Sequence, residues 1–458
     1  MPFARTRLAL GLAFALGLGL GAASPAQAQS LVELYEAARG YDATYLAARA
    51  LLDSAEYRVD QARALQRPSV GLQVSGSRTT SDTPFSSTQR ADTNTVSAGL
   101  SASQTLFNRA NSATIGQAEK SLEVSRADFD AADQDLIVRV AQAYFDVLAA
   151  QDALATTRTG KTAISEQLAS AKRNFEVGTA TITDTREAQA RFDLAVAQEI
   201  AAENDLRTKR IALDQLVGRN DVAPKGLAVP VVLPVVQPAA VDAWVGRADA
   251  EHPTIRRARL GLDVAKLETD KARAGHLPVV TLSGSLSKGS VSTSGNAQVS
   301  TAGGSVVQAF NSSGSATNSS IGVTMNLPLY AGYAIQNRVK ETLLLEEKSR
   351  NDLEAARRGV AQGTRQAFFG VQSGEAQVKA LEAAESSSQL ALEATQLGYR
   401  VGVRVNLDVL NAQTQLFTTR RDLAKARYDV LVGSLRLRQA AGRLTPEDVA
   451  AISRLLAN

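Results

Sequence analysis

The chain has 458 residues, of which 44% are hydrophobic, and a formal net charge of +4 at pH 7. It has no cysteine, which excludes disulfides, a catalytic thiol and a lipid anchor on an N-terminal cysteine. Acidic and basic residues are interspersed, with no basic stripe and no interleaved aromatics, so the composition argues against nucleic-acid binding.

The first 28 residues have the pattern of a secretory signal peptide. Arg5 and Arg7 precede an apolar run over residues 8–20, and Ala26-Gln27-Ala28 has the form of a cleavage site. The run is too short to span a membrane as a helix, and a retained anchor helix is the alternative. We expect residues 1–28 to be removed and Gln29 to begin an exported chain, whose net charge is +2 once the two arginines are lost from +4.

Common signatures of enzymes are missing. There is no G-x-S-x-G, H-E-x-x-H or P-loop motif in the mature sequence, and the glycine-rich run at 17–21 belongs to the signal peptide. The two histidines, His252 and His276, lie far apart in sequence and have no thiol beside them, which disfavours a transition-metal site. We expect neither an enzyme nor a cofactor.

The mature sequence contains an internal repeat. The first copy covers residues 29–220, the second covers 241–442, a linker with four prolines (221–240) joins them, and a tail (443–458) follows. Residues 62–64, 68, 70 and 72 recur 210 positions later, and residues 177–178, 184 and 188–189 recur 224 positions later. Duplicated units of this kind stack side by side around a shared surface.

Two long intervals without proline predict the main helices, at 108–176 and 332–400. Each would be roughly 100 Å long at 1.5 Å per residue, which suits a coiled coil or a bundle. Apolar residues recur every seven positions in the first interval: Leu122, Phe129, Leu136, Ala143 and Ala150, with Val140, Val147 and Leu154 beside them. Shorter helices are expected at 31–65, 182–217, 241–274 and 407–441.

Glycine turns separate each long helix from the shorter helix after it. The turns are predicted at Gly178 and Gly402. Thr181 with Asp184 forms a capping box for the first restart, and Asn406 is expected to cap the second.

Four short segments with period-two alternation predict strands, at about 69–77, 95–105, 279–287 and 320–328. One face of each is apolar and the other polar, as in a water-filled barrel in lipid; the edge of a soluble sandwich is the alternative. The connections at 78–94 and 288–320 are polar and are expected to be flexible loops. Phe107 and Tyr330 end matching strands, either as interfacial aromatics or as core residues.

Four strands are too few to close a barrel, because bacterial membrane barrels have at least about eight. Several chains must therefore share one barrel. Two copies would give a filled barrel of about eight strands and three would give a channel of about twelve, and helices of this length favour the channel.

Motifs at the strand ends and helix turns carry a family resemblance. They are G-H-L-P at 275–278, L-P-L-Y-A-G at 327–332, N-F-E-V-G at 174–178 with I-T-D at 182–184, G-Y-R-V-G at 398–402, L-D-V-L-N-A at 407–412, A-R-Y at 426–428 and G-R-L at 442–444. In combination they resemble the TolC family of outer-membrane channel-tunnels, over nearly all of the mature chain.

The resemblance implies a mostly α fold with membrane β structure. In it, a homotrimer shares a twelve-stranded β-barrel in the outer membrane lipid of a Gram-negative bacterium, and its coiled-coil α-helical barrel crosses the periplasm. The tunnel would dock onto a periplasmic adaptor (membrane fusion) protein and an inner-membrane ABC or proton-driven transporter, to export proteins, small toxic compounds or both.

The resemblance also implies site residues. The periplasmic gate matches Thr183 and Asp184 in one copy and Tyr399 and Arg404 in the other. The tunnel constriction matches Asp408 and Asn411, where the family often has a second aspartate, and the turns at Gly178 and Gly402 would contact the adaptor. From the residues alone, Asp184 is equally a helix cap and Arg404 a solvated surface base.

A barrel-anchored trimeric coiled-coil adhesin is the alternative from another class. It would also be exported and rich in alanine and serine. Such a protein places its strands at one chain end and a head domain at the other, whereas here the predicted strands interrupt the helices twice.

Overall fold

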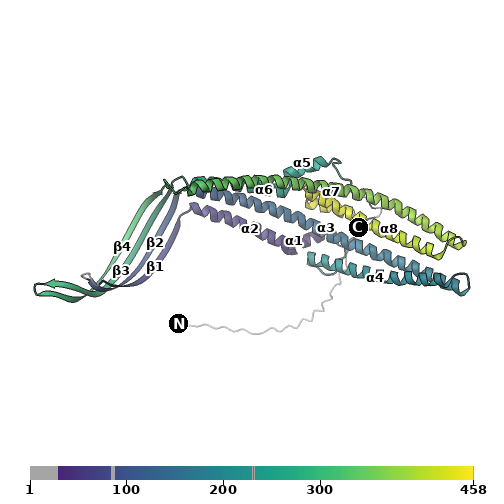
Figure 1. Cartoon of the computed structure of the whole chain (residues 1–458), viewed down its shortest axis with the longest axis horizontal. Coiled ribbons are helices and arrows are strands. Elements are labelled where there is room, and N and C mark those ends of the chain that lie inside the picture. Colours follow the sequence, from purple (N-terminus) through teal and green to yellow (C-terminus); the bar gives the residue numbers. More distant parts are fainter. Residues whose placement is uncertain (1–28, 84–87, 229–230, 232, 457–458) are drawn as a thin grey trace, which may run out of the picture.

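The computed structural model describes residues 29–83, 88–228, 231 and 233–456. The predicted signal peptide, residues 1–28, lies outside these described residues. The molecule is elongated, with a four-stranded sheet at one end and long helices running from it to the other end (Figure 1).

The element order is duplicated. Two helices, two strands and two further helices follow one another, and then the same order begins again. The elements are α1 (Leu31–Tyr41), α2 (Ala43–Arg63), β1 (Ser69–Asp82), β2 (Thr88–Phe107), α3 (Arg109–Glu176) and α4 (Ile182–Val217), then α5 (Val241–Glu251), α6 (Pro253–Ala274), β3 (Val279–Thr301), β4 (Gly304–Asn326), α7 (Ala334–Arg400), α8 (Asn406–Ala440) and α9 (Pro446–Ser453), with a short 3-10 turn at Ala64–Gln66.

The long helices match their predicted bounds within two residues. α3 has 68 residues and α7 has 67, so each is about 100 Å long. Asn108 caps α3 by accepting hydrogen bonds from the backbone N–H groups of Ala110 and Asn111, at 3.0 and 3.4 Å. The predicted seam along α3 is buried or half-buried throughout, including Leu136, Val140 and Val147, which confirms the heptad pattern.

The two helices predicted at 31–65 and 241–274 are each broken in two, contrary to the prediction. The breaks lie at Asp42 and His252, which are 210 residues apart and therefore equivalent in the repeat. Asp42 Oδ1 accepts a hydrogen bond from Tyr45 N at 2.8 Å, and His252 Nδ1 accepts one from Thr254 N at 3.1 Å. Each side chain caps the second helix, and Pro253 lacks the N–H that a continuous helix would use.

The largest core joins the first helix, the middle of α3, the end of α8 and α9. Its fully buried members include Leu31, Leu34, Tyr144, Phe145, Leu431 and Leu435. Tyr428 of α8 stacks on Phe145 of α3, with ring centroids 5.7 Å apart, and its hydroxyl donates to Asp152 Oδ2 at 2.6 Å. These contacts fix α8 to α3 near the middle of the molecule.

An ion pair ties the break at Asp42 to α3. Arg139 donates to both carboxylate oxygens of Asp42, at 2.9 and 3.0 Å. The hydrogen bond from Arg139 lowers the pKa of the Asp42 carboxyl, and its burial opposes the shift. The pair therefore stays ionised, and it holds α1 and α2 against the long helix.

The four strands form one antiparallel sheet in the order β1-β2-β3-β4. They are longer than predicted, because most of 78–94 and 288–320 continues the ladders instead of forming loops. The β1–β2 pairing runs from Ser69↔Ser103 to Asp82↔Arg90, and β3–β4 from Val279↔Asn326 to Thr301↔Gly304. Serine, glycine and asparagine favour loops in the local sequence, but here they lie within paired strands.

The alternation predicted for the strands is confirmed near the helices. Paired residues share a face: Leu72 lies opposite Leu100, and Leu100 opposite Leu286. Val70, Val74, Ile321, Val323 and Met325 extend this apolar face and are exposed in the single chain. On the other face, serines pair across strands, with Ser75 Oγ 2.8 Å from Ser97 Oγ and Ser285 Oγ 2.8 Å from Ser320 Oγ.

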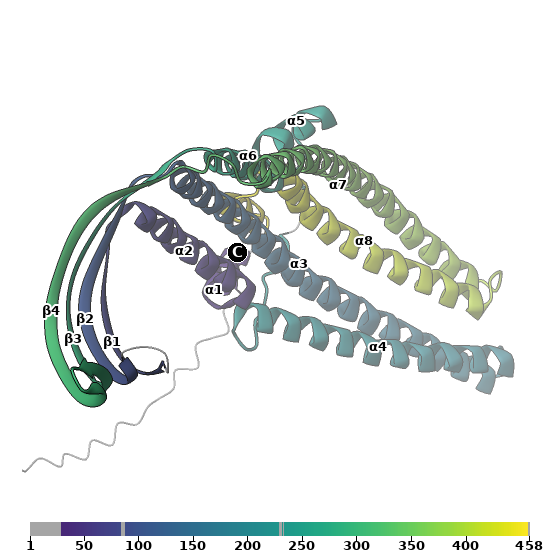
Figure 2. The ribbon, with the colours of Figure 1, turned by 60° about the vertical axis from the view of Figure 1, so that its left-hand side comes forward.

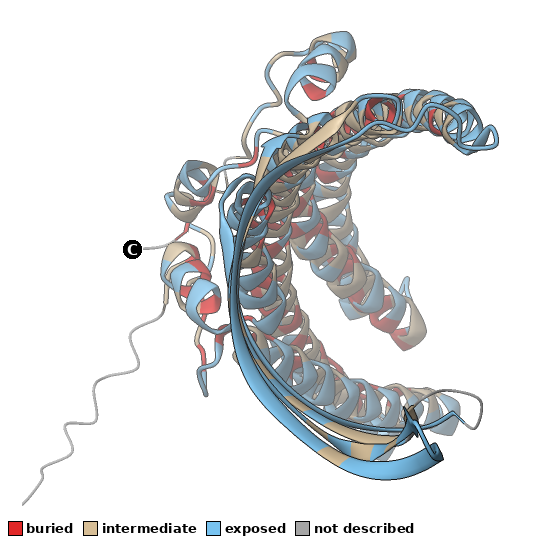
Figure 3. Ribbon diagram, turned by 90° about the vertical axis from the view of Figure 1, so that its left-hand side faces the viewer, coloured by how far each residue is buried: buried red, intermediate tan, exposed pale blue. Residues whose placement is uncertain are grey.

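Beyond the sheet, the helices form two hairpins, α3 with α4 and α7 with α8 (Figure 2). Seen along the long axis, sheet and helices together make a curved shell that is open on one side (Figure 3). No helix in the described part of the chain combines the length and apolar character needed to cross a membrane.

Candidate functional site at the helical tip

The two turns at the far end have the same backbone geometry. Gly178 and Gly402 have φ of +78° and +79°. Thr179 N donates to Asn174 O and Val403 N donates to Gly398 O, both at 2.8 Å. Gly178 N and Gly402 N donate to the carbonyls of Phe175 and Tyr399, at 3.0 and 3.1 Å. These are Schellman motifs, which need a residue with positive φ after the helix, and glycine supplies it without strain.

Each helix after a turn has an aspartate as its third residue, Asp184 in α4 and Asp408 in α8. Thr181 N donates to Asp184 Oδ2 at 2.9 Å, and Asp184 N donates to Thr181 Oγ1 at 3.2 Å, which confirms the predicted capping box. Asp408 is the equivalent residue and accepts from Val405 N at 3.5 Å. Asp408 also pairs with Arg404, with Nη1 3.6 Å from Oδ2.

The prediction that Asn406 caps α8 is wrong. Val405 precedes the helix and Asn406 is its first residue. The Asn406 side chain is buried, and its Oδ1 accepts a hydrogen bond from Gln167 Nε2 of α3. The repeat explains why the cap lies one residue earlier than predicted. Thr181 caps α4, and the equivalent residue 224 positions later is Val405.

The predicted gate residues lie at the tip but on different hairpins. Thr183 and Asp184 are in the first turn of α4, Tyr399 is near the end of α7, and Arg404 is in the turn after it. Among the described residues of one chain, neither Thr183 nor Asp184 forms a hydrogen bond or ion pair with Tyr399 or Arg404. The described chain alone therefore does not bring the two sets together.

Near the tip, three polar contacts among the described residues join the two hairpins within one chain. Asn174 Nδ2 of α3 donates to the Tyr399 hydroxyl at 3.1 Å, and Arg191 Nη2 of α4 donates to Asn411 Oδ1 at 2.9 Å. The bond between Gln167 and Asn406 is the third. Sequence reasoning missed Asn174, Arg191 and Gln167, because only the tertiary packing places them opposite the predicted residues.

Gly398 affects where the side chain of Arg404 lies at the tip. A Cβ on Gly398 would lie 2.8 Å from Arg404 Cγ, so the glycine leaves room for the arginine stem to lie across the end of α7. Arg404 N donates to Gly398 O at 3.1 Å. The conformation of the turn therefore sets the path of the Arg404 side chain.

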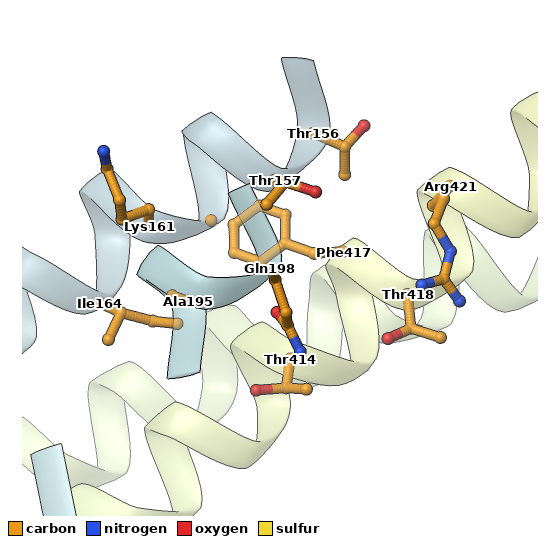
Figure 4. A pocket seen from close by; sticks show the side chains of 11 residues that line it. Thr156, Thr157, Lys161, Ile164, Ala195, Gln198, Thr414, Phe417, Thr418 and Arg421 are labelled. Atoms are coloured by element: carbon orange, nitrogen blue, oxygen red, sulfur yellow. The ribbon is translucent and has the colours of Figure 1, made fainter. Parts of the chain in front are cut away.

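A polar cavity of about 100 Å³ lies between α3, α4 and α8, farther from the turns than these contacts. Figure 4 shows Phe417 reaching into it from α8, with Thr157, Gln198, Thr414 and Thr418 around it. The Phe417 ring is 3.1 Å from where a Gly160 Cβ would be. The hairpins are therefore packed less tightly here than at Tyr428.

No group of three or more potential metal ligands occurs in the part of the chain that the structure describes. The side chains at the tip offer hydrogen bonds and ion pairs between helices.

Comparison with known proteins agrees with the fold. A family model described as "Outer membrane efflux protein" matches residues 34–219 and 244–443. Outer membrane protein TolC of Vibrio cholerae is 33% identical over 423 residues, which cover 92% of each chain. The alkaline protease secretion protein AprF of Pseudomonas aeruginosa is 32% identical over 427 residues, 92% of this chain and 83% of that protein.

Among solved structures, the outer membrane protein VceC of Vibrio cholerae superposes with a TM-score of 0.72. The sequence identity is 20%, and the match covers 90% of this chain and 96% of that one. This likeness concerns the fold: long helices joined to a small sheet.

Proposed function

The chain belongs to the outer membrane efflux protein family, and on that premise we propose that three copies of it assemble into one gated exit duct. The protein is located in the outer membrane, with its helices in the periplasm, and it serves secretion and efflux. Each copy would supply four of twelve strands to a shared barrel and two helical hairpins to a tunnel.

The open edges of the sheet carry this proposal. β1 and β4 each pair with one strand only within the described chain. An unpaired edge and an exposed apolar face are both unfavourable, since in lipid every backbone N–H and C=O needs a partner. Closing the edges with other copies satisfies the backbone and leaves the polar face toward a water-filled lumen.

The adhesin alternative has no support. The strands lie between α2 and α3 and again between α6 and α7. The helices therefore form antiparallel hairpins that return toward the sheet, and no separate head domain occurs among the described residues.

The tip would be the gate in the resting state. Arg404, Tyr399, Thr183 and Asp184 are proposed as gate residues, with Asn174 as the partner of Tyr399 in the same chain. One exposed ion pair contributes roughly 0–1 kcal/mol. Threefold symmetry multiplies this, so the closed tip would be favoured by a few kcal/mol (about 3 × 1) if the pairs are partly shielded.

We predict that the double variant Arg404→Ser, Tyr399→Phe has a higher single-channel conductance than the wild type. The first change removes the contact with Asp408 and the second removes the acceptor for Asn174. Both changes weaken the closed tip and leave the sheet intact. Conductance of the purified protein in planar lipid bilayers measures the effect.

A matched control uses an exposed tyrosine and an i,i+4 ion pair far from the tip. Tyr57 is exposed on α2, and Arg358 pairs with Glu354 at 3.0 Å on α7. The variant Tyr57→Phe, Arg358→Ser should conduct like the wild type. Equal conductance of the tip variant and this control would remove the gate assignment but not the duct.

The turns at Gly178 and Gly402 are proposed as the contact for a periplasmic adaptor. They expose Val177, Val401 and Val403, with 73, 65 and 78% of each residue accessible. Apolar side chains at an exposed helix end suit a protein partner. Docking there by the adaptor and an inner-membrane transporter would bias the gate toward its open state.

The narrowest part of the tunnel is proposed at Asp408 and Asn411. Both face arginines, Arg404 at 3.6 Å and Arg191 at 2.9 Å. The cargo is proposed to be proteins, small toxic compounds or both. Deleting the gene and comparing drug sensitivity with the secreted protein profile separates these cargos.

A further inference from the structure

β3 and β4 are longer than a membrane requires. Each has 23 residues, whereas about 9–11 tilted residues cross the hydrocarbon layer. The apolar face runs outward from Met325 to Ile321 on β4 and to Leu286 on β3, and Ser319 and Thr317 follow Ile321 on the same face. Some twelve residues of each strand therefore continue past the lipid, which is about 40 Å of strand.

The face of the hairpin that carries the apolar band becomes polar where the band ends. Near the helices, the face of Leu282, Leu286, Ile321 and Val323 is apolar. Farther out, the same face consists mostly of hydroxyl and amide side chains: Ser290, Ser292, Ser294, Asn296 and Ser300 on β3, and Ser305, Asn311, Ser313 and Ser315 on β4.

The opposite face is mixed. It carries Ser283, Ser285 and Ser320 near the helices, and farther out Val291, Val299, Val306 and Phe310 are interspersed with Thr293, Gln308 and Ser312. The β3–β4 register is continuous from Val279↔Asn326 to Thr301↔Gly304. No bulge interrupts the β3–β4 pairing, so the change on the outer face comes from the sequence and not from a rotation of the strands.

A single cation marks the boundary. Lys288 lies on the apolar face, between Leu286 and Ser290, and it is the only charged residue in β3 or β4. It is exposed and forms no ion pair among the described residues. Lysine at the end of an apolar band places its ammonium at the level of lipid head groups.

Along this face the chemistry changes in three layers: aliphatic side chains, one ammonium, then neutral hydroxyls and amides. We propose that the outer face of the β3–β4 hairpin binds a phosphorylated glycolipid of the outer leaflet. The acyl chains contact the aliphatic residues, a phosphate contacts Lys288, and the sugar chain lies along the serine and asparagine residues beyond it. This rests on the proposed function, since it needs the barrel in the outer membrane.

The absence of cysteine makes a clean test possible. Ser292 and Ser313 are directly paired on the outer face, and each is changed to cysteine in the full chain. Intact cells are treated with a membrane-impermeant maleimide, in one strain with full-length sugar chains and one with truncated chains. We expect both cysteines to react in intact cells, and several-fold faster where the sugars are truncated.

Neighbouring positions supply the controls. Val291→Cys lies one residue away on the opposite face and should react at similar rates in both strains, and Leu286→Cys in the lipid band should stay unlabelled. Equal rates for Ser292→Cys and Ser313→Cys in the two strains would overturn the sugar contact. Labelling only after permeabilisation would overturn the placement of the hairpin outside the lipid.

The phosphate contact has its own readout. Lys288→Gln should co-purify with several-fold less phosphorylated glycolipid than the wild type, measured by mass spectrometry. Lys340→Gln, an exposed lysine on α7, should not differ from it. Equal amounts with Lys288→Gln would contradict the contact. The conductance of the wild-type protein in planar bilayers is measured alongside. If it forms channels, only the phosphate contact has failed, whereas the absence of channels would contradict the duct itself.

Discussion

At the scale of single residues, equivalent positions of the repeat use different chemistry for one task. Asp42 and His252 each cap the second helix of a broken pair. Asp42 is a charged cap held by Arg139, whereas His252 must be neutral for Nδ1 to accept the hydrogen bond from Thr254 N. The two halves therefore respond differently to acid.

We predict that acid weakens the cap at His252. Burial lowers the pKa of this imidazole, so its contribution to folding is fully present above its ordinary pKa of about 6.5 and is lost as the pH falls through the lower, folded value. Protonation removes the acceptor, and loss of a cap costs about 1 kcal/mol.

The variant His252→Asn tests this, because asparagine caps a helix without titrating. Between about pH 7.5 and pH 5 its unfolding temperature should fall less than that of the wild type, as followed by circular dichroism in detergent. His276→Asn, at an exposed histidine, should behave like the wild type. The prediction fails if His252→Asn keeps the wild-type pH dependence.

At the scale of elements, the helical tips depend on their glycines for conformation and not for space. A Cβ at Gly178 or Gly402 would meet no atom within 4 Å, but both residues have positive φ. We predict that Gly178→Ala and Gly402→Ala each destabilise the tip by about 1–2 kcal/mol, the cost of a left-handed conformation for an L-residue.

Hydrogen–deuterium exchange of peptides from the tip measures this, with an expected rise of roughly 5–30-fold. Gly359→Ala is the matched control, since Gly359 also has open space but lies inside α7 without positive φ. That change should slightly stabilise the helix. An unchanged exchange rate at the turns would show that they are not held in the Schellman geometry.

The sequence predicted the long elements well and the contacts between them poorly. The proline-free intervals located α3 and α7, and the heptad seam supported α3, because both signals lie in the local sequence. The strands were predicted too short, since serine and glycine favour loops locally, and only pairing with a neighbour makes them strands. The breaks at Asp42 and His252 were missed, although the offset of 210 places two capping residues in register.

The tip shows the same division. The glycine turns and the box at Thr181 and Asp184 follow from local sequence, and the structure contains them. Asn174, Arg191 and Gln167 could not be found, because their partners are more than 200 residues away. The proposed contacts of Asp184 with Tyr399 or Arg404 depend on another copy, which no feature of one chain specifies.

At the scale of the whole molecule, the single chain is an open shell. Its sheet has two free edges, and its apolar face includes Ile321 with 83% of the residue accessible. Such a surface is stable only when covered by lipid and closed by neighbours. The duct, its gate and the lipid contact of the β3–β4 hairpin all require this closure.

Native mass spectrometry of the detergent-extracted protein tests that requirement most directly. We predict a complex of three chains with no folded monomer at equilibrium, because the edges of β1 and β4 stay unpaired in one copy. A folded monomer that remains dispersed at concentrations typical of the membrane would contradict the shared barrel.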